Sequence, residues 1–418
     1  MTHRSGKSRP HSAAQLSRRG LLVGAGLGTV GLAAAQAAPA LPGDQDVVDL
    51  THQYTFYGSA GQAGIHTPPQ RYVFFMTFDL TTTERSGLQL LLARWSASIA
   101  QLMKGETIGQ VEPQRANGVG FDTGEALNLG PASLTVTVGL GPKVFTGTYG
   151  LAGQKPTLLR ELVALPSDAL RPAFTGGDLS LQACADDPQV AYHAIRDLAR
   201  IAKDTGTAST RWAVMGFGRA SAGKGQSTPR NLLGFKDGTR NIKDNTDFEK
   251  FVWVKDGLSW THRGTYQVVR KIKMDIENWD TDRVGDQNNV FGRHKVSGAP
   301  LTGKKEFDPP DFAQNGDDGK PIIPDNAHIR LAAHENNEGL KILRRSYNYT
   351  EGINEVGLLD AGLLFIAYQN DPANFEALQA KLGASDALNE YISHIGSAIF
   401  FVPPAPNEGS YIAQELFT

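Results

Sequence analysis

The sequence predicts an α+β fold in which one unit of strands and helices occurs twice. The main observation is an internal repeat, because Leu179 to Pro188 parallels Leu363 to Pro372 with a constant offset of 184 residues. Each copy is a strand-like run that ends in Asp-Pro, where Asp can cap a helix and Pro suits its first position. A chain of 418 residues, 40% hydrophobic and 20% charged, has room for one large domain or two of medium size.

The first forty residues differ from the rest and predict an export signal. They carry five positive charges and no acid, with Arg18 and Arg19 directly ahead of the Gly-, Ala- and Leu-rich segment Leu21 to Ala38. Four glycines interrupt this segment, which is barely long enough to span a bilayer, so a cleaved signal is favoured over an anchor. We expect a twin-arginine signal peptide at 1–40. This route carries folded proteins to the periplasm or the outer face of the cell envelope.

Charge and cysteine content exclude several classes of function. Removal of the leader takes the net charge from −2 to −7, which argues against nucleic acid or an anionic membrane surface as the main partner. Cys184 is the single cysteine, so the chain has no disulfide framework and no cysteine-based metal site. A metal held by the protein must therefore bind to histidine or carboxylate.

The elements of the first unit follow from apolar spacing. After a polar arm at Asp44 to Gln70, Tyr72 to Leu80 has the length and composition of a strand. Thr81 to Met103 has apolar residues at helical spacing, and Leu134 to Leu140 alternates as a half-buried strand does. The first repeat copy leads into a predicted helix, Val190 to Ala202, with Gly206 as its C-cap.

The second unit begins after a Ser-, Gly- and Lys-rich linker at Ala220 to Pro229, which gives expected domains at 45–220 and 221–418. Tyr266 to Ile276 alternates as a strand, and Lys304 to Asp325 is a long Pro-, Asp- and Gly-rich loop. Further elements are expected at Leu363 to Tyr368 (strand), Phe375 to Leu382 (helix, with Gly383 as C-cap) and Ala398 to Val402 (strand). No stretch after the leader is long and apolar enough to span a membrane.

Four sequence blocks resemble a known enzyme family. They are Gly234 to Thr239 (GFKDGT), Phe291 to Leu301 (FGRHKVSGAPL), Ala327 to Leu331 (AHIRL) and Ile342 to Arg345 (ILRR). In this order they resemble the dye-decolourising haem peroxidases, and in particular the exported deferrochelatase/peroxidase subgroup. The resemblance implies two ferredoxin-like domains with antiparallel sheets and one haem b per chain, held in the C-terminal half.

The resemblance makes His328 the axial ligand of the haem iron, a role that suits histidine in peroxidases. A zinc pair of His328 and His334 is disfavoured, because six residues turn a helix by about 600° and separate the two rings. His294 and His394 are expected to be ordinary polar or core histidines. A carboxylate or carbonyl should hold the other ring nitrogen of His328. The carboxylates considered, with equal weight, are Glu277, Asp282 and Asp286.

Asp237 and Arg344 correspond to the catalytic pair of the family. Splitting peroxide requires a group that takes a proton from one oxygen and returns it to the other, which a carboxylate can do. A fixed cation stabilises the charge that develops as the O–O bond breaks. Arg345 follows Arg344 directly, so a one-residue shift in the assignment stays open.

The same blocks imply further contacts to haem. Gly238 and Thr239 would line the haem face, while Arg240 and Arg330 suit the propionates because guanidinium pairs with carboxylate in a bidentate way. The family also places haem contacts at residues 333–335. Here this chain departs from many relatives, which carry Asn-Pro-Arg where it has Ala333, His334 and Glu335.

The sequence thus predicts an exported haem b peroxidase that uses hydrogen peroxide to oxidise phenolic or dye-like donors. The subgroup is also credited with releasing iron from haem while the porphyrin stays intact. The alternative is a haem-binding or haem-delivery protein of an iron-uptake system with little turnover, and a third interpretation is a structural domain without haem. Partners from a ferrous-iron uptake system and a homo-oligomer stay open.

Overall fold

The computed structural model describes residues 48–58, 60–218 and 228–418. The predicted signal peptide at 1–40 and most of the predicted linker at Ala220 to Pro229 lie outside these residues. The domain boundary expected at residue 220 therefore stays a prediction. The described residues of the predicted arm, 48–58 and 60–70, contain no helix or strand.

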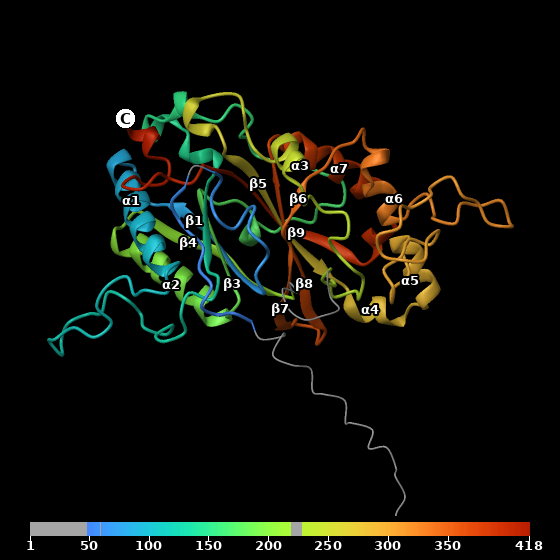
Figure 1. Ribbon diagram of the computed structural model, residues 1–418, viewed down its shortest axis with the longest axis horizontal. Coiled ribbons are helices and arrows are strands. Elements are labelled where there is room, and N and C mark those ends of the chain that lie inside the picture. The colour runs from blue at the N-terminus through green and yellow to red at the C-terminus, as the bar shows by residue number, and fades with distance from the viewer. Residues whose placement is uncertain (1–47, 59, 219–227) are drawn as a thin grey trace, which may run out of the picture. The chain divides into compact units, whose positions relative to one another are not determined.

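The first repeat unit has the strand and helix order βαββαβ. Its elements are β1 (Tyr72–Leu80), α1 (Arg85–Leu102), β2 (Thr135–Leu140), β3 (Leu179–Ala185), α2 (Pro188–Asp204) and β4 (Ala208–Phe217). The strands are antiparallel in the order β2-β3-β1-β4. Helix α2 packs on β1, β3 and β4, and α1 packs on α2 (Figure 1). This arrangement is a ferredoxin-like unit.

The second unit repeats this arrangement with insertions. Its strands are β5 (Thr265–Met274), β7 (Tyr347–Ile353), β8 (Leu359–Gln369) and β9 (Ile392–Val402), and they lie antiparallel in the order β9-β5-β8-β7. Helix α7 (Pro372–Ser385) packs against β8 and β5. The remaining elements are α3 (Asn245–Phe251) before β5, and α4 (Ile276–Thr281), α5 (Val284–Phe291), α6 (His328–Ala332) and β6 (Leu343–Arg344) between β5 and β7. The predicted duplication of ferredoxin-like units is confirmed.

The two units share one sheet. Strand β2 pairs with β9 at Leu140 and Phe401, and β4 pairs with β7 over two residue pairs. Since β5 and β8 also pair, eight strands are each paired on both sides and form a closed ring, with β6 added at β8. Two buried apolar clusters each contain residues of both units, so side-chain packing joins the units as well.

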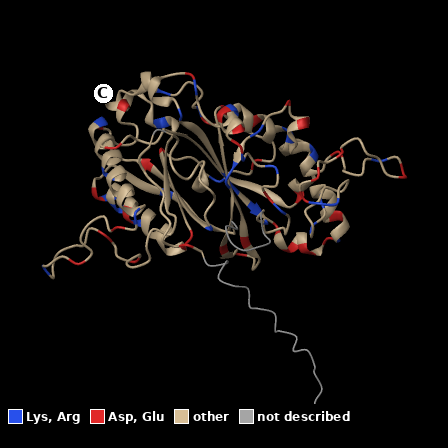
Figure 2. Ribbon diagram, in the orientation of Figure 1, with Lys and Arg blue, Asp and Glu red and all other residues tan. Residues whose placement is uncertain are grey.

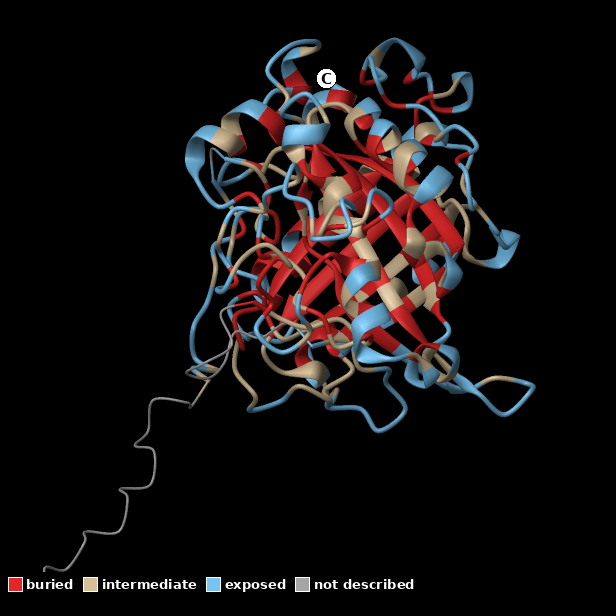
Figure 3. Ribbon diagram, turned by 90° about the vertical axis from the view of Figure 1, so that its right-hand side faces the viewer, coloured by how far each residue is buried: buried red, intermediate tan, exposed pale blue. Residues whose placement is uncertain are grey.

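The expectation that the strand at Leu134 to Leu140 is half-buried was wrong, and closure of the sheet explains why. Leu134 to Leu140 alternates in sequence, but all six residues of β2 are buried rather than half of them. Strand β2 lies between β3 and β9, and the side chain of Gln62 bonds to both the N–H and the C=O of Val138. Threonines suit such a strand, because their hydroxyls find buried partners, as Thr137 does at the carbonyl of Ala63. In Figure 3 the strands are mostly buried, and exposure concentrates in loops and outer helical faces.

Both Asp-Pro helix starts are confirmed. Asp187 accepts hydrogen bonds from the N–H groups of Gln189 and Val190, and Asp371 accepts one from Ala373. Gly206 follows α2 with φ of 63°, as expected for a residue that ends a helix.

The predicted role of Gly383 is wrong, because α7 continues through it to Ser385. A Cβ at this position would lie 2.3 Å from the carbonyl oxygen of Pro166. The glycine is therefore required by the close approach of another segment and not by the end of the helix.

Acidic and basic residues alternate along the ribbon of the described residues, as the colours in Figure 2 show. Within the described residues, no helix combines the length and apolar character needed to cross a membrane. The long loop expected at Lys304 to Asp325 is confirmed, since it contains only an isolated bridge between Asn315 and Pro321.

Candidate active site

The GFKDG block forms a tight turn stabilised by its own backbone. The N–H of Asn231 donates to the carbonyl of Phe235, and the N–H of Phe235 donates back to Oδ1 of Asn231. Asp237 follows at the end of this turn, with its N–H bonded to the carbonyl of Pro229 at 2.8 Å. Gly238 has φ of 123°, a conformation that glycine adopts without strain. The turn therefore fixes the backbone on both sides of Asp237.

Arg344 lies directly beside Asp237, although 107 residues separate them in sequence. Nη1 of Arg344 donates to Oδ1 of Asp237 in a salt bridge, with both side chains partly exposed. The side chain of Asn241 bonds to both the N–H (2.9 Å) and the C=O (2.7 Å) of Arg344. The turn thus holds β6 through Asn241, and this contact sets the position of the Arg344 side chain against Asp237.

The neighbouring arginine has a different environment. Arg345 is 2% exposed and donates to the carbonyls of Thr67 and Pro68 and to the side chain of Gln70. Its guanidinium anchors the N-terminal arm and does not line the cavity described below. Of the two arginines, it is Arg344 that faces Asp237.

His328 is the first residue of α6, and its ring is held from two sides. Nδ1 lies 2.6 Å from Oδ2 of Asp386, whose other oxygen accepts a hydrogen bond from the N–H of Leu388. Phe291 meets the ring edge-on at 5.9 Å between centroids and stacks on Phe235 of the turn at 4.0 Å. The ring orientation is therefore set by a carboxylate and an aromatic pair, and Nε2 is the nitrogen left for a metal.

The carboxylate beside His328 was not found by sequence reasoning. All three residues considered were wrong: Glu277 accepts from the N–H of Leu359, Asp282 accepts from the hydroxyl of Tyr391, and Asp286 makes no contact with His328. Asp386 lies 58 residues after His328, in the turn between α7 and β9. Its one local signal is its place ahead of a short helical turn, which indicates capping and not a histidine partner.

The charge of Asp386 changes the proton affinity of His328. Burial lowers the pKa of the imidazole, but the negative charge and hydrogen bond of Asp386 outweigh it, so the net pKa is raised. Arg344 lowers and Asp237 raises the same pKa, which indicates that all four groups lie in one electrostatic environment. A carboxylate that favours the imidazolium also makes the imidazole a stronger electron donor to a metal.

These side chains line one cavity that opens to solvent, and the empty space within it and its mouth is about 1660 Å³. All lining residues lie between Asn231 and His394, that is, in the C-terminal half. The walls are mainly apolar and include Ile272, Met274, Phe291, Leu363, Phe365 and Leu378.

The structure brings together most of the predicted contact residues. The cavity is lined by Asp237, Gly238, Thr239, Arg240, His328, Ala333, His334 and Arg344. Glu335 is not in the lining, but it binds Arg240 through both carboxylate oxygens at 2.5 and 2.9 Å. Arg330 is not in the lining either, and donates to the carbonyls of Ile323 and Phe312.

Two further histidines line the cavity. His394, expected to be an ordinary core residue, is buried and also lines the cavity, and burial lowers its pKa to about 3. His334 lies 3.4 Å from Glu335 through Nδ1.

The fold and site define an α+β protein with a mainly apolar cavity, a carboxylate-held imidazole and an Asp–Arg pair. Comparison with protein families identifies the same two parts, because residues 62–218 match the model "Dyp-type peroxidase, N-terminal" and residues 228–407 match "Dyp-type peroxidase, C-terminal". The chain belongs to the Dyp-type peroxidase family, and it is a haem peroxidase.

Relatives and solved structures agree with this assignment. The chain is 38% identical to a deferrochelatase of Yersinia pestis, over 96% of this chain and 94% of the relative. It is 36% identical to a dye-decolorizing peroxidase of Thermobifida fusca, over 96% and 97%. A DyP-type peroxidase from Streptomyces coelicolor superposes with a TM-score of 0.82 at 38% identity, covering 88% of this chain and 98% of that one. Ferric DtpA from Streptomyces lividans gives 0.81 at 38% identity, over 88% and 97%.

The residues of the cavity fit a haem group. Apolar walls suit the porphyrin plane, and the imidazole of His328, held by Asp386 through Nδ1, would suit axial binding to iron through Nε2. Arg240 at the wall offers a guanidinium of the kind that pairs with carboxylates, although Glu335 already engages it. The donor set thus matches haem bound without a covalent thioether link.

Proposed function

We propose that this haem peroxidase binds one haem b per chain through His328 and reduces hydrogen peroxide with the help of Asp237 and Arg344. The observation that carries the proposal is that one cavity contains both the carboxylate-held imidazole and the Asp237–Arg344 pair. Haem supplies the redox-active iron at which peroxide is reduced and donors are oxidised. The two polar side chains supply the proton transfer and charge stabilisation that this reaction needs.

In this proposal Asp237 takes the proton from one peroxide oxygen and delivers it to the other, which leaves as water. Arg344 stabilises the negative charge on the leaving oxygen. The turn at 231–238 and the Asn241 bonds to Arg344 hold both groups before peroxide arrives, so little reorganisation is required. Gly238, Thr239, Ala333 and His334 line the haem site, and Arg240 with Glu335 forms its charged border.

The donors we propose are phenolic or dye-like, as the name of the Thermobifida fusca relative indicates for that protein. The direct test is steady-state turnover of the purified holoprotein with peroxide and a phenolic dye. Haem binding without turnover would favour the haem-delivery interpretation.

A second activity is release of iron from substrate haem with the porphyrin left intact, which is favoured by the curated relatives named deferrochelatase. Incubation with haem, followed by the fluorescence of free protoporphyrin, measures it separately from dye oxidation.

Asp386→Asn is expected to weaken haem retention without unfolding the protein. Asparagine keeps the capping bond to Leu388 but removes the charge that favours a strongly donating imidazole. Loss of such a partner typically costs about 10–100-fold in metal affinity or activity. We expect faster haem transfer to apomyoglobin and a more positive reduction potential. Asp371→Asn is the control. Asp371 caps the N-terminal end of α7, whereas Asp386 follows its C-terminal end. Equal transfer rates in both variants would contradict this role of Asp386.

We also propose export by the twin-arginine route to the periplasm or the outer face of the cell envelope, with components of a ferrous-iron uptake system as partners. Replacement of Arg18 and Arg19 by Lys keeps the charge but removes the guanidinium pair that the export receptor reads. The precursor is then expected to stay in the cytoplasm, as measured by fractionation and peroxidase activity of each fraction. Normal export of the double variant would exclude this route.

A further inference from the structure

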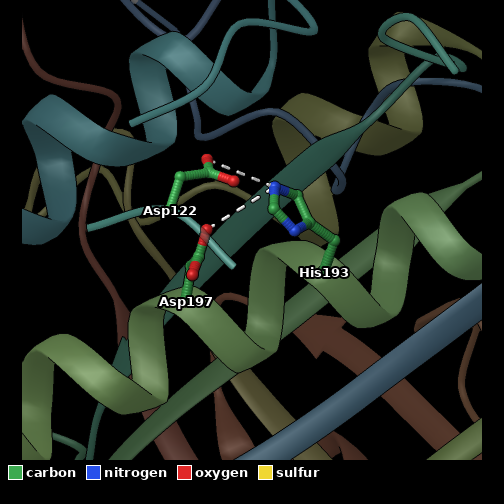
Figure 4. Close-up of side chains that lie close together, drawn as sticks. All are labelled: Asp122, His193 and Asp197. Carbon is green, nitrogen blue, oxygen red and sulfur yellow. Dashed lines mark ion pairs between the residues drawn. The ribbon is translucent and has the colours of Figure 1, made fainter. Parts of the chain in front are cut away.

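A second cluster of metal-binding side chains lies in the first unit, away from the haem cavity. It consists of Asp122, from the long connection between α1 and β2, and of His193 and Asp197, one turn apart on α2. All three are buried, and one ligand atom of each lies within 4.8 Å of the other two. Figure 4 shows both carboxylates pointing at one nitrogen of His193.

The other neighbours of His193 favour a proton on Nδ1. This nitrogen lies 3.3 Å from the hydroxyl oxygen of Thr123 and 3.2 Å from Oε2 of Glu125, whose negative charge favours an N–H on that side. With the proton on Nδ1, Nε2 presents a lone pair toward Asp122 and Asp197. A lone pair that faces two carboxylates is unfavourable unless a cation lies between them.

The distances from Nε2 of His193 to the two carboxylates fit a bound metal ion and not a shared proton. Nε2 lies 3.5 Å from Oδ2 of Asp197 and 3.6 Å from Oδ2 of Asp122. A charge-assisted N–H···O bond would be about 2.7–2.9 Å long, so an imidazolium makes no normal hydrogen bond here. Zinc bonds of about 2.0–2.2 Å in a tetrahedron place two ligand atoms about 3.3–3.6 Å apart, which matches the distances from Nε2 to the two carboxylate oxygens.

An independent observation is the unsatisfied oxygen of Asp197. Oδ2 is buried and accepts no hydrogen bond within the described residues, while Oδ1 accepts one from the N–H of Thr123. Asp197 is fully buried, and an ionised carboxylate with an unpaired oxygen is costly in such a place. Asp122 is already positioned by backbone N–H groups of Ile108 and Gly124. The cluster is therefore organised around a point that the protein itself does not fill.

We propose that Asp122, His193 and Asp197 bind a divalent transition-metal ion of the zinc class, with Glu125 orienting the imidazole through Nδ1. Imidazole with carboxylate oxygens is a ligand set that zinc accepts, and a water molecule would complete four-coordination. The carboxylate–histidine–metal arrangement is common at such sites. Bound metal would fasten the connection between α1 and β2 to helix α2, where Arg200 already donates to the carbonyl of Phe121.

Zinc content of the purified holoprotein tests the proposal. We expect about one zinc per chain after dialysis against zinc and then against metal-free buffer, measured by mass spectrometry beside the haem iron. Asp197→Asn and His193→Gln should each lose this zinc. Asp204→Asn, on the exposed face at the end of the same helix, should keep it. An unchanged Soret band in each variant shows that the fold survives.

Glu125→Gln separates a metal site from a buried ion pair. It should reduce zinc affinity by about 10–100-fold, measured by competition with a chromophoric chelator, because it removes the charge beside Nδ1 of the imidazole and leaves the three metal ligands in place. Zinc should also raise the melting temperature of the parent but not of Asp197→Asn. If the parent holds no more zinc than Asp197→Asn, the cluster is an ion pair of His193 with carboxylates and the proposal is wrong.

Discussion

Asp237→Ala and Arg344→Leu are expected to keep haem but lose most of their reactivity toward peroxide. A general acid–base group typically contributes about 10²–10⁴-fold, and a charge-stabilising donor about 10²–10³-fold. Neither side chain makes the contact that holds His328, so the Soret band of the ferric protein should survive. Rapid mixing with peroxide, followed by the rate of change in Soret absorption, measures the loss.

The two losses need not add, because the residues contact each other and act on one transition state. Arg263→Leu is a suitable control, since Arg263 is an exposed arginine paired with Glu249 and does not line the cavity. If both active-site variants reacted with peroxide at the parent rate, the proposed mechanism would be wrong. The haem-delivery interpretation would then gain support.

His328→Ala is expected to lose most of its bound haem, or to retain it with a changed spin state. The substitution removes the imidazole that Asp386 and Phe291 hold in place beside the Asp237–Arg344 pair. Haem content per chain, from the pyridine haemochrome spectrum, and the visible spectrum of any haem that remains measure the effect.

His334→Ala is the matched control for this variant. His334 also lines the cavity, but its Nδ1 faces Glu335 on the border of the site. Its haem content should match that of the parent protein. Unchanged haem content and spectrum in His328→Ala would exclude His328 as the axial ligand.

The sequence predicted the fold well because the signals were local. Strand β1 lies where its apolar run placed it, and the two Asp-Pro helix starts carry their own capping chemistry. The predictions were wrong where contact with a segment distant in sequence determines burial or the end of a helix. Strand β2 is buried on both faces because β9 closes the sheet beside it, and Gly383 lies within α7 because Pro166 approaches it.

The residues of the site also fall into those that local sequence signals predicted and those that they missed. His328, Asp237 and Arg344 were located because they lie in short blocks that resemble a family. Asp386 and Asn241 were missed, since each acts on a residue 58 or 103 positions away and no local pattern marks either one. The cluster around His193 was missed for the same reason, because Asp122 comes from a long irregular connection.

Closure of the sheet bears on how the protein can be divided experimentally. Cutting the chain between the units would leave β2 and β4 of the first, and β7 and β9 of the second, with unpaired backbone edges. The cut would also expose apolar side chains such as Val73 and Phe400, which share one cluster across the junction. A truncated haem-binding half should therefore aggregate or dimerise through those edges, whereas co-expressed halves should reassemble into a soluble, haem-loaded complex.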